Sequence, residues 1–143
     1  MDGKSNEITA IPLLLEQLDL TGTIITIDAM GTQTAIARQI RECEADYILA
    51  LKANRGKLDQ TAQKWFQHWQ QQRPHAQMGL DQFARVEKGH HRIETRQVWV
   101  FSASEVFSEE LRSPWLGLQS LVVVRTQRHL WNQTTCETRF FLS

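Results

Sequence analysis

Two apolar segments with a helical segment between them constrain the fold of this 143-residue chain most strongly. Thr23–Ile27 contains only Thr and Ile, whose β-branched side chains fit a pleated, buried surface, and Asp46–Leu51 is a second short apolar run. Between them, Thr34–Cys43 places apolar residues among charged ones at helical spacing. A strand, a helix and a strand of these lengths require a parallel pair joined by a right-handed crossover. We therefore predict an α/β fold in which Thr23–Ile27 is a central strand.

A carboxylate, Asp28, directly follows the first of these strands. Open α/β sheets present ligand-binding groups at the carboxyl ends of their strands, but Asp also commonly caps a following helix, so the local pattern leaves both roles open. Lys52, Asn54, Arg55 and Lys57 follow the second strand and should lie at the same edge. A carboxylate beside such a loop could seat a metal ion and a phosphodiester. One carboxylate alone cannot hold Mg²⁺ in a hydrolytic geometry, and no second acidic residue has an evident claim to assist it.

The rest of the chain predicts two more helices and then a β-rich half. Ser5 or Asn6 is expected to cap a first helix. The buried face of that helix is predicted to consist of Ile8, Ile11, Leu14, Leu15 and Leu18. A helix is expected at Leu58–Gln72 and a short helix between Ser104 and Trp115. Strands are expected at Phe83–Glu87, Ile93–Val100 and Leu121–Arg125. Hairpin turns are expected at Gly89–His90 and Asn132–Gln133. We predict a partial α/β core over residues 1–72 and a β-rich region over residues 73–143, in the same folding unit or as a subdomain.

Three side-chain groups each admit a structural and a functional interpretation. Trp65 and Trp69 share one helix face, which favours a core role over a base-stacking platform. Arg92, Glu94 and Arg96 lie on one face of a predicted strand, where the arginines could bind phosphate or form a solvated row of ion pairs. A zinc site made from His90, His91 and Cys136 lacks a recognisable ligand spacing and is disfavoured.

Composition limits the possible classes of protein. With 41% hydrophobic and 22% charged residues, the chain is typical of a globular protein. Its formal net charge of zero argues against a strongly basic nucleic-acid-binding domain, so any DNA role must rest on local patches. The apolar runs are too short to cross a membrane, and the N-terminus lacks a secretory apolar region. Cys43 and Cys136 lie far apart without metal-ligand spacing, which predicts reduced thiols and a cytoplasmic location.

Four ordered blocks of the sequence resemble a known family. They are KSNEITAIP at residues 4–12, TIDAMGTQ at 26–33, ADYILALKAN at 45–54 and HHRIETR at 90–96. Together they resemble the H-repeat-associated type of bacterial insertion-sequence transposase, a DDE transposase with an RNase H-like catalytic core. Each block alone is weak, whereas four in order across nearly the whole chain are specific.

The resemblance implies DNA strand cleavage and transfer at element ends by Mg²⁺ ions, with Asp28 as the second of three catalytic acids. The family's first acid belongs to a strand upstream of the Lys4 block, and its third is a glutamate beyond Ser143. Glu94 lies on a predicted strand and is not assigned this role. We therefore expect a transposase fragment that is inactive alone and whose first strand exposes an edge that invites self-association or pairing with a full-length transposase. The alternatives are a residual DNA-binding or transposase-interfering fragment that uses Lys52, Arg55, Lys57, Arg92 and Arg96, or a decayed remnant without a selected role.

Overall fold

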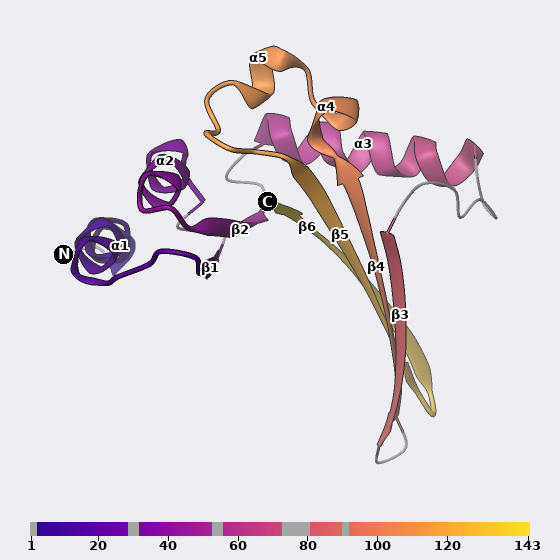
Figure 1. The fold of residues 1–143 in the computed structure, drawn as a ribbon. Helices are drawn as coiled ribbons and strands as arrows, with labels where there is room; N and C mark the ends of the chain where they lie inside the picture. Colours follow the sequence, from indigo (N-terminus) through magenta and orange to yellow (C-terminus); the bar gives the residue numbers. More distant parts are fainter. Residues whose placement is uncertain (1–2, 29–31, 53–55, 73–80, 90–91) are drawn as a thin grey trace.

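The computed structural model describes residues 3–28, 32–52, 56–72, 81–89 and 92–143 and contains one mixed sheet with helices on one side (Figure 1). The helices are α1 (Gly3–Gln17), α2 (Thr34–Glu42), α3 (Gly56–Gln72), α4 (Ala103–Val106) and α5 (Glu109–Arg112). The strands are β1 (Ile24–Ile27), β2 (Asp46–Leu51), β3 (Asp81–Gly89), β4 (Arg92–Ser102), β5 (Ser120–Leu130) and β6 (Gln133–Leu142). The α/β class and the parallel pair of β1 and β2 are confirmed. Before β5, where one short helix is expected, the structure has two, α4 and α5.

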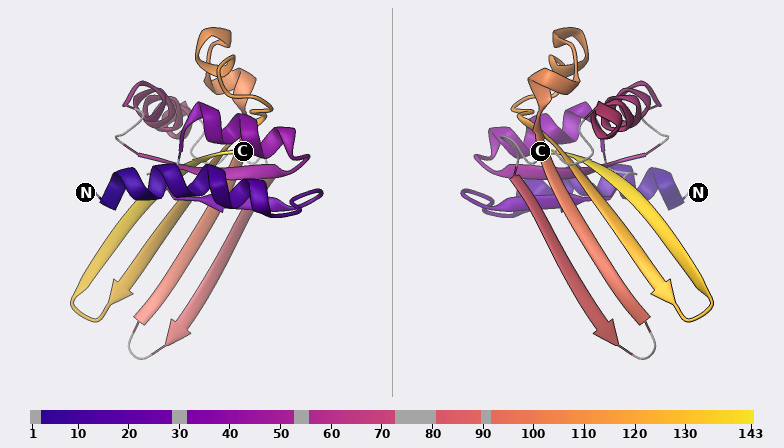
Figure 2. Two further views of the ribbon diagram at one scale, coloured as in Figure 1. Left: turned by 90° about the vertical axis from the view of Figure 1, so that its left-hand side faces the viewer. Right: turned by 90° about the vertical axis from the view of Figure 1, so that its right-hand side faces the viewer.

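The six strands follow the order β1-β2-β6-β5-β4-β3. Among the described strands, β1 and β2 are the parallel pair, with Ile27 beside Leu49, and all the other neighbours are antiparallel. Strand β6 pairs with β2 through Leu49–Leu142 to Leu51–Phe140 and so joins both halves of the chain in one sheet. The long strands β3 to β6 extend well beyond the helices and end in two hairpin tips (Figure 2).

The predicted central position of Thr23–Ile27 is wrong for the described sheet. Strand β1 lies at one end of the strand order, and its side chains are alternately exposed and half-buried, with Ile24 66% exposed. A sequence of β-branched residues fits a pleated strand equally well at an edge or in the middle, because the neighbours that decide the position are not local. The expected unpaired edge is confirmed within the part of the chain that the structure describes.

Helix α1 also corrects two expectations. It begins at Gly3, so Ser5 and Asn6 lie inside it and neither is its N-cap, and it continues through Pro12. Leu15 is buried, but Leu14 and Leu18 are 57% and 51% exposed. The reason is that α1 lies beside β1 and α2 rather than across the sheet, with Gln39 Nε2 donating to the Pro12 carbonyl at 2.9 Å (Figure 1).

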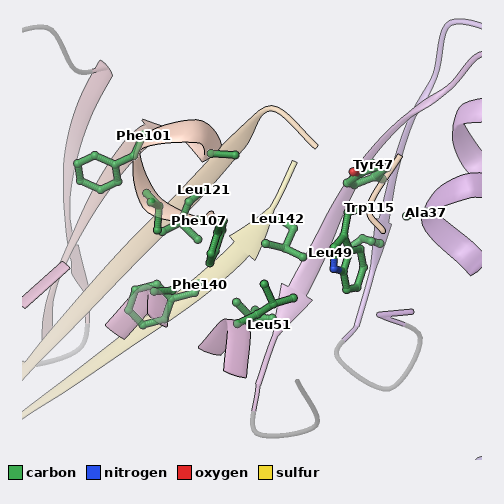
Figure 3. Close-up of a cluster of buried hydrophobic side chains, with 14 of the residues drawn as sticks. Ala37, Tyr47, Leu49, Leu51, Phe101, Phe107, Trp115, Leu121, Phe140 and Leu142 are labelled. Atoms are coloured by element: carbon green, nitrogen blue, oxygen red, sulfur yellow. The ribbon is translucent and has the colours of Figure 1, made fainter. Parts of the chain in front are cut away.

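The core lies where the helices cover the ends of the strands nearest to β2 (Figure 3). Trp65 and Trp69 of α3 pack against it, which confirms their structural interpretation. Phe66, between them, is 2% exposed and lies 5.2 Å from Trp99, centroid to centroid. Other buried residues include Leu49, Leu51, Phe101, Phe107, Trp115, Leu121, Phe140 and Leu142.

Tyr47 ties β2 to the segment before β5. It is 1% exposed, and its hydroxyl donates to the Leu116 carbonyl at 3.0 Å. Burial raises the pKa of Tyr47 to about 12, an effect that the nearby Arg41 guanidinium partly opposes. The phenol is therefore protonated at neutral pH. Among the described residues, no helix combines the length and the apolar character needed to cross a membrane.

Candidate functional site

Asp28 lies where the sequence places it, directly after β1 and exposed to solvent. Strand β2 runs parallel to β1 and ends at Leu51, so Lys52 leaves the sheet at the same edge and is also exposed. The α/β topology thus brings one carboxylate and one ammonium group to the carboxyl ends of two neighbouring strands.

Thr32 fastens the backbone around Asp28 to the sheet. Its side chain is fully buried, and its Oγ1 donates to the Ala50 carbonyl of β2 at 2.6 Å and lies 3.4 Å from the Asp28 carbonyl oxygen. The N-cap of α2 is Gln33, which has extended backbone angles. The alternative that Asp28 caps this helix is therefore wrong, because the chain passes through the buried Thr32 before the helix begins.

The basic residues predicted beside Asp28 are only partly within the described chain. Lys57 is exposed in the first turn of α3, where its carbonyl accepts from Thr61 Oγ1 at 2.7 Å. Asn54 and Arg55 lie outside the described residues. Lys52 lines a cavity of about 300 Å³ at the corner where β2 ends and β6 continues beneath α3. Asp59, Gln63, Glu137 and Arg139 also line this cavity.

Asp59, Glu137 and Arg139 were not among the sequence predictions. Asp59 could have been found, because it lies one turn into the helix that follows the Lys52 loop. Glu137 and Arg139 reach the cavity only because β6 pairs with β2, and no local pattern announces that pairing. The carboxylates and the basic groups of this cavity balance in formal charge.

The second predicted basic group lies on β4. Arg92 pairs with Gly89 and Leu130 through the backbone register. Glu94 is 8% exposed, 3.1 Å from Arg96 Nη2 and 3.8 Å from Arg128 Nε of the neighbouring strand. Arg96 is thus engaged in an ion pair on a strand face, as the structural interpretation of this row expects. Glu94 lies on a strand and not on a helix.

The described residues do not by themselves fit a two-metal centre. They contain no group of three or more His, Cys, Asp or Glu side chains placed to hold a metal ion. Two-metal phosphoryl transfer needs several converging carboxylates, so Asp28 with its described neighbours supplies too few. His90 and His91 of the disfavoured zinc site lie outside the described residues, and Cys136 is a free, exposed thiol.

Comparison with known proteins identifies the family to which the chain belongs. The family model described as "Transposase DDE domain" matches residues 1–133. The chain belongs to the DDE transposase domain family.

The relatives identify the type within the family. The chain is 38% identical over 129 residues to the Escherichia coli K12 protein named "H repeat-associated putative transposase YhhI", covering 90% of this chain and 33% of that protein. It is 38% identical over 145 residues to "Putative transposase YncI" of Escherichia coli O157:H7, covering 99% and 36%. A third relative, "Uncharacterized protein in dhlA 3'region" of Xanthobacter autotrophicus, is 42% identical over 143 residues, covering 100% and 46%. The chain is therefore a DDE transposase domain of the H repeat-associated type, as the four sequence blocks indicate.

The chain spans less than half the length of these three relatives, between 33% and 46%. No solved structure matches the chain.

Proposed function

We propose that this chain serves metal-dependent DNA strand cleavage and transfer by contributing Asp28, and that the 143 residues by themselves do not catalyse it. The observation that carries the proposal is the position of Asp28 at the carboxyl end of β1, beside the end of the parallel strand β2. Membership of the DDE transposase domain family supports a catalytic role for this carboxylate. The buried Thr32 hydrogen bond to Ala50 fixes the backbone that presents it.

The parallel pair of β1 and β2, joined through α2, supports an RNase H-like core as part of this proposal. The proposal includes a division into a core over residues 1–72 and a β-rich insertion over residues 73–143. The edge of β1 supports self-association or pairing with a longer transposase. Free cysteines and a DNA substrate are consistent with a cytoplasmic location.

Mg²⁺ is the metal that the family implies, and the described residues do not assemble its site alone. Asp28 would be its ligand in this chain. Two-metal catalysis requires further carboxylates. We propose that the 143 residues are inactive by themselves because Asp28 alone supplies too few metal ligands.

DNA contact is the part of the function that this chain could perform without a metal ion. Lys52 and Lys57 are exposed beside the Asp28 edge and are the proposed phosphate contacts, together with Asn54 and Arg55. Arg92 and Arg96 on β4 form a second proposed set, although Arg96 is already paired with Glu94. Binding without catalysis, which would let the chain interfere with an active transposase, is favoured by the absence of a metal-ligating cluster among the described residues.

Removing a carboxylate charge at either end of β1 tests where DNA binds. In the absence of divalent metal, Asp28 should repel a bound phosphate, so Asp28→Asn should tighten binding of a labelled duplex several-fold at low salt. Asp19→Asn is the matched control, because Asp19 precedes β1 at the opposite end and is also exposed. The Asp19→Asn variant should bind the labelled duplex with unchanged affinity.

The basic residues provide the second arm of the test. Lys52→Ala with Lys57→Ala should weaken binding and reduce the slope of log affinity against log salt by about 0.9 for each phosphate that is no longer neutralised. Arg92→Ala with Arg96→Ala tests the β4 set in the same way. If Asp28→Asn and Asp19→Asn behave alike and no basic variant changes the salt slope, DNA does not occupy this edge and the proposal fails.

A further inference from the structure

A second polar cavity, of about 390 Å³, lies between α3 and the strands β5 and β6. Its polar lining consists of Gln63, Gln67 and Gln70 from α3, Arg125 from β5 and Thr138 from β6. The three glutamines recur at intervals of four and three residues, which places them on one face of the helix. No carboxylate from the described part of the chain lines this cavity.

Arg125 is held rigidly in the wall of this cavity. Its Cζ lies 5.5 Å from the centroid of Phe66 and 5.6 Å from that of Trp99, so two aromatic rings flank the guanidinium. Its Nη2 donates to Gln70 Oε1 at 3.1 Å. The Nε atom is enclosed and has no hydrogen-bond acceptor among the described residues. The only described polar partner of this cation is thus a neutral amide.

The unmatched guanidinium edge identifies the chemistry of a ligand. An enclosed donor without an acceptor is unfavourable, and more so when it is charged. The Nε and Nη2 hydrogens of arginine point in parallel and match two oxygens of one oxyanion. The amide group of Gln67 and the hydroxyl of Thr138 can donate further hydrogen bonds from other directions. A group with several acceptor oxygens, such as a phosphate, fits this arrangement better than a carboxylate with two.

Gln70 is the side chain that an oxyanion would displace when it binds to Arg125. It lies near the end of α3, is partly exposed, and its carbonyl oxygen already occupies the position of one ligand oxygen on Nη2. Rotation of the Gln70 side chain would free Nη2 for a ligand oxygen while the two rings continue to flank the guanidinium.

We propose that the Arg125 cavity binds a phosphate group, with Gln70 as the side chain that the phosphate displaces. The cavity shares the lining residues Gln63, Thr138 and Phe140 with the cavity that contains Lys52, so the two cavities are neighbours along α3. A backbone phosphate of DNA is the expected source, which rests on the proposed function. Free inorganic phosphate carries the same chemistry.

Nitrogen-edited NMR of the full chain tests the phosphate group directly. Titration with inorganic phosphate should shift the Arg125 Nε–H signal and the Gln70 amide signals, and chloride at equal ionic strength should not. Arg125→Lys keeps the charge but loses the fork, so phosphate binding should weaken about tenfold or more. Arg38→Lys is the matched control on the exposed face of α2 and should bind as the unchanged protein does.

A Gln70→Glu variant separates a binding role from a packing role. The new carboxylate would sit on Nη2 as a permanent counter-ion, so phosphate binding should be abolished while the melting temperature stays the same or rises. If phosphate leaves the Arg125 Nε–H signal unmoved, or if Gln70→Glu binds phosphate normally, the proposal is wrong.

Short oligonucleotides distinguish the two sources. Displacement of phosphate by an oligonucleotide, with a weaker salt dependence in Arg125→Lys, supports a DNA phosphate in the cavity. Phosphate binding without any oligonucleotide binding would uphold the phosphate site and reject the DNA function. Oligonucleotide binding that Arg125→Lys leaves unchanged in affinity and salt slope would reject the site and leave the DNA function standing.

Discussion

Replacing Phe66 by Ala removes the side chain that attaches α3 to the sheet. Phe66 is 2% exposed and meets four other rings, with centroid distances of 5.2 Å to Trp99, 6.0 Å to Trp69, and 6.1 Å to both Phe101 and Phe140. It also lies beneath the Arg125 guanidinium. The substitution therefore opens a cavity at a junction of α3, β4, β5 and β6.

The expected cost follows from burial and from the ring contacts. Phe→Ala in a core costs roughly 3–5 kcal/mol in transfer and cavity terms. Each aromatic pair can add about 0.5–1.5 kcal/mol beyond burial, although neighbouring contacts are not additive. We expect a loss of about 4 kcal/mol. For a domain of this size, that loss corresponds to a fall in melting temperature of very roughly 10–20 °C.

Urea unfolding followed by tryptophan fluorescence and by circular dichroism measures this loss. Trp131→Ala is the control, because Trp131 is 86% exposed near the hairpin turn between β5 and β6 and should change stability by no more than about 0.5 kcal/mol. A Phe66→Ala variant that loses less than about 1.5 kcal/mol, or loses no more than Trp131→Ala, would show that α3 does not cover the sheet through this ring.

Two further predictions concern the backbone around the site and the buried phenol. Thr32→Val keeps the shape of a fully buried side chain but leaves the Ala50 carbonyl without its 2.6 Å donor, so it should lower the free energy of unfolding in urea by roughly 1–3 kcal/mol. Thr32→Ser is the control because it keeps the hydroxyl. Amide exchange at residues 50–52 should be faster in Thr32→Val than in Thr32→Ser. The folded state raises the pKa of Tyr47 from 10.0 to about 12, so the stabilisation of the protonated phenol is complete below about pH 10 and is lost as the pH rises toward 12. Tyr47→Phe should remove that alkaline loss. The free energy of unfolding is measured for the unchanged protein and for Tyr47→Phe at pH 9 and at pH 12. If both proteins lose the same stability between these pH values, the burial of this phenol is contradicted.

The parts of the fold that sequence could predict are those set by local pattern. Strand β2 begins and ends where the apolar run does, and α2 follows the helical spacing of its apolar residues. Parallel pairing of β1 and β2 follows from the helix between them, because a chain with that order of elements has few ways to bury both apolar faces. The position of Asp28 at a strand end follows from the same reasoning.

The parts that sequence could not predict depend on pairing between distant segments. Leu14 fits the helical repeat of α1, and Leu18 continues that repeat past the helix end at Gln17. Both are exposed because α1 packs beside α2 and not over the sheet. The union of β2 with β6 creates the cavity that contains Glu137 and Arg139. Arg125 follows a run of valines and has the pattern of an ordinary strand-end cation. The pairing of β4 with β5 brings Trp99 to its guanidinium, and the crossing of α3 brings Phe66.

A nicking and strand-joining assay tests the central claim most directly. The purified chain is incubated with supercoiled and linear DNA and Mg²⁺ or Mn²⁺, alongside Asp28→Asn and Asp19→Asn. We predict DNA binding without cleavage for all three proteins, because Asp28 alone supplies too few metal ligands. Metal-dependent nicking or joining by the unchanged chain that Asp28→Asn abolishes and Asp19→Asn preserves would contradict the account.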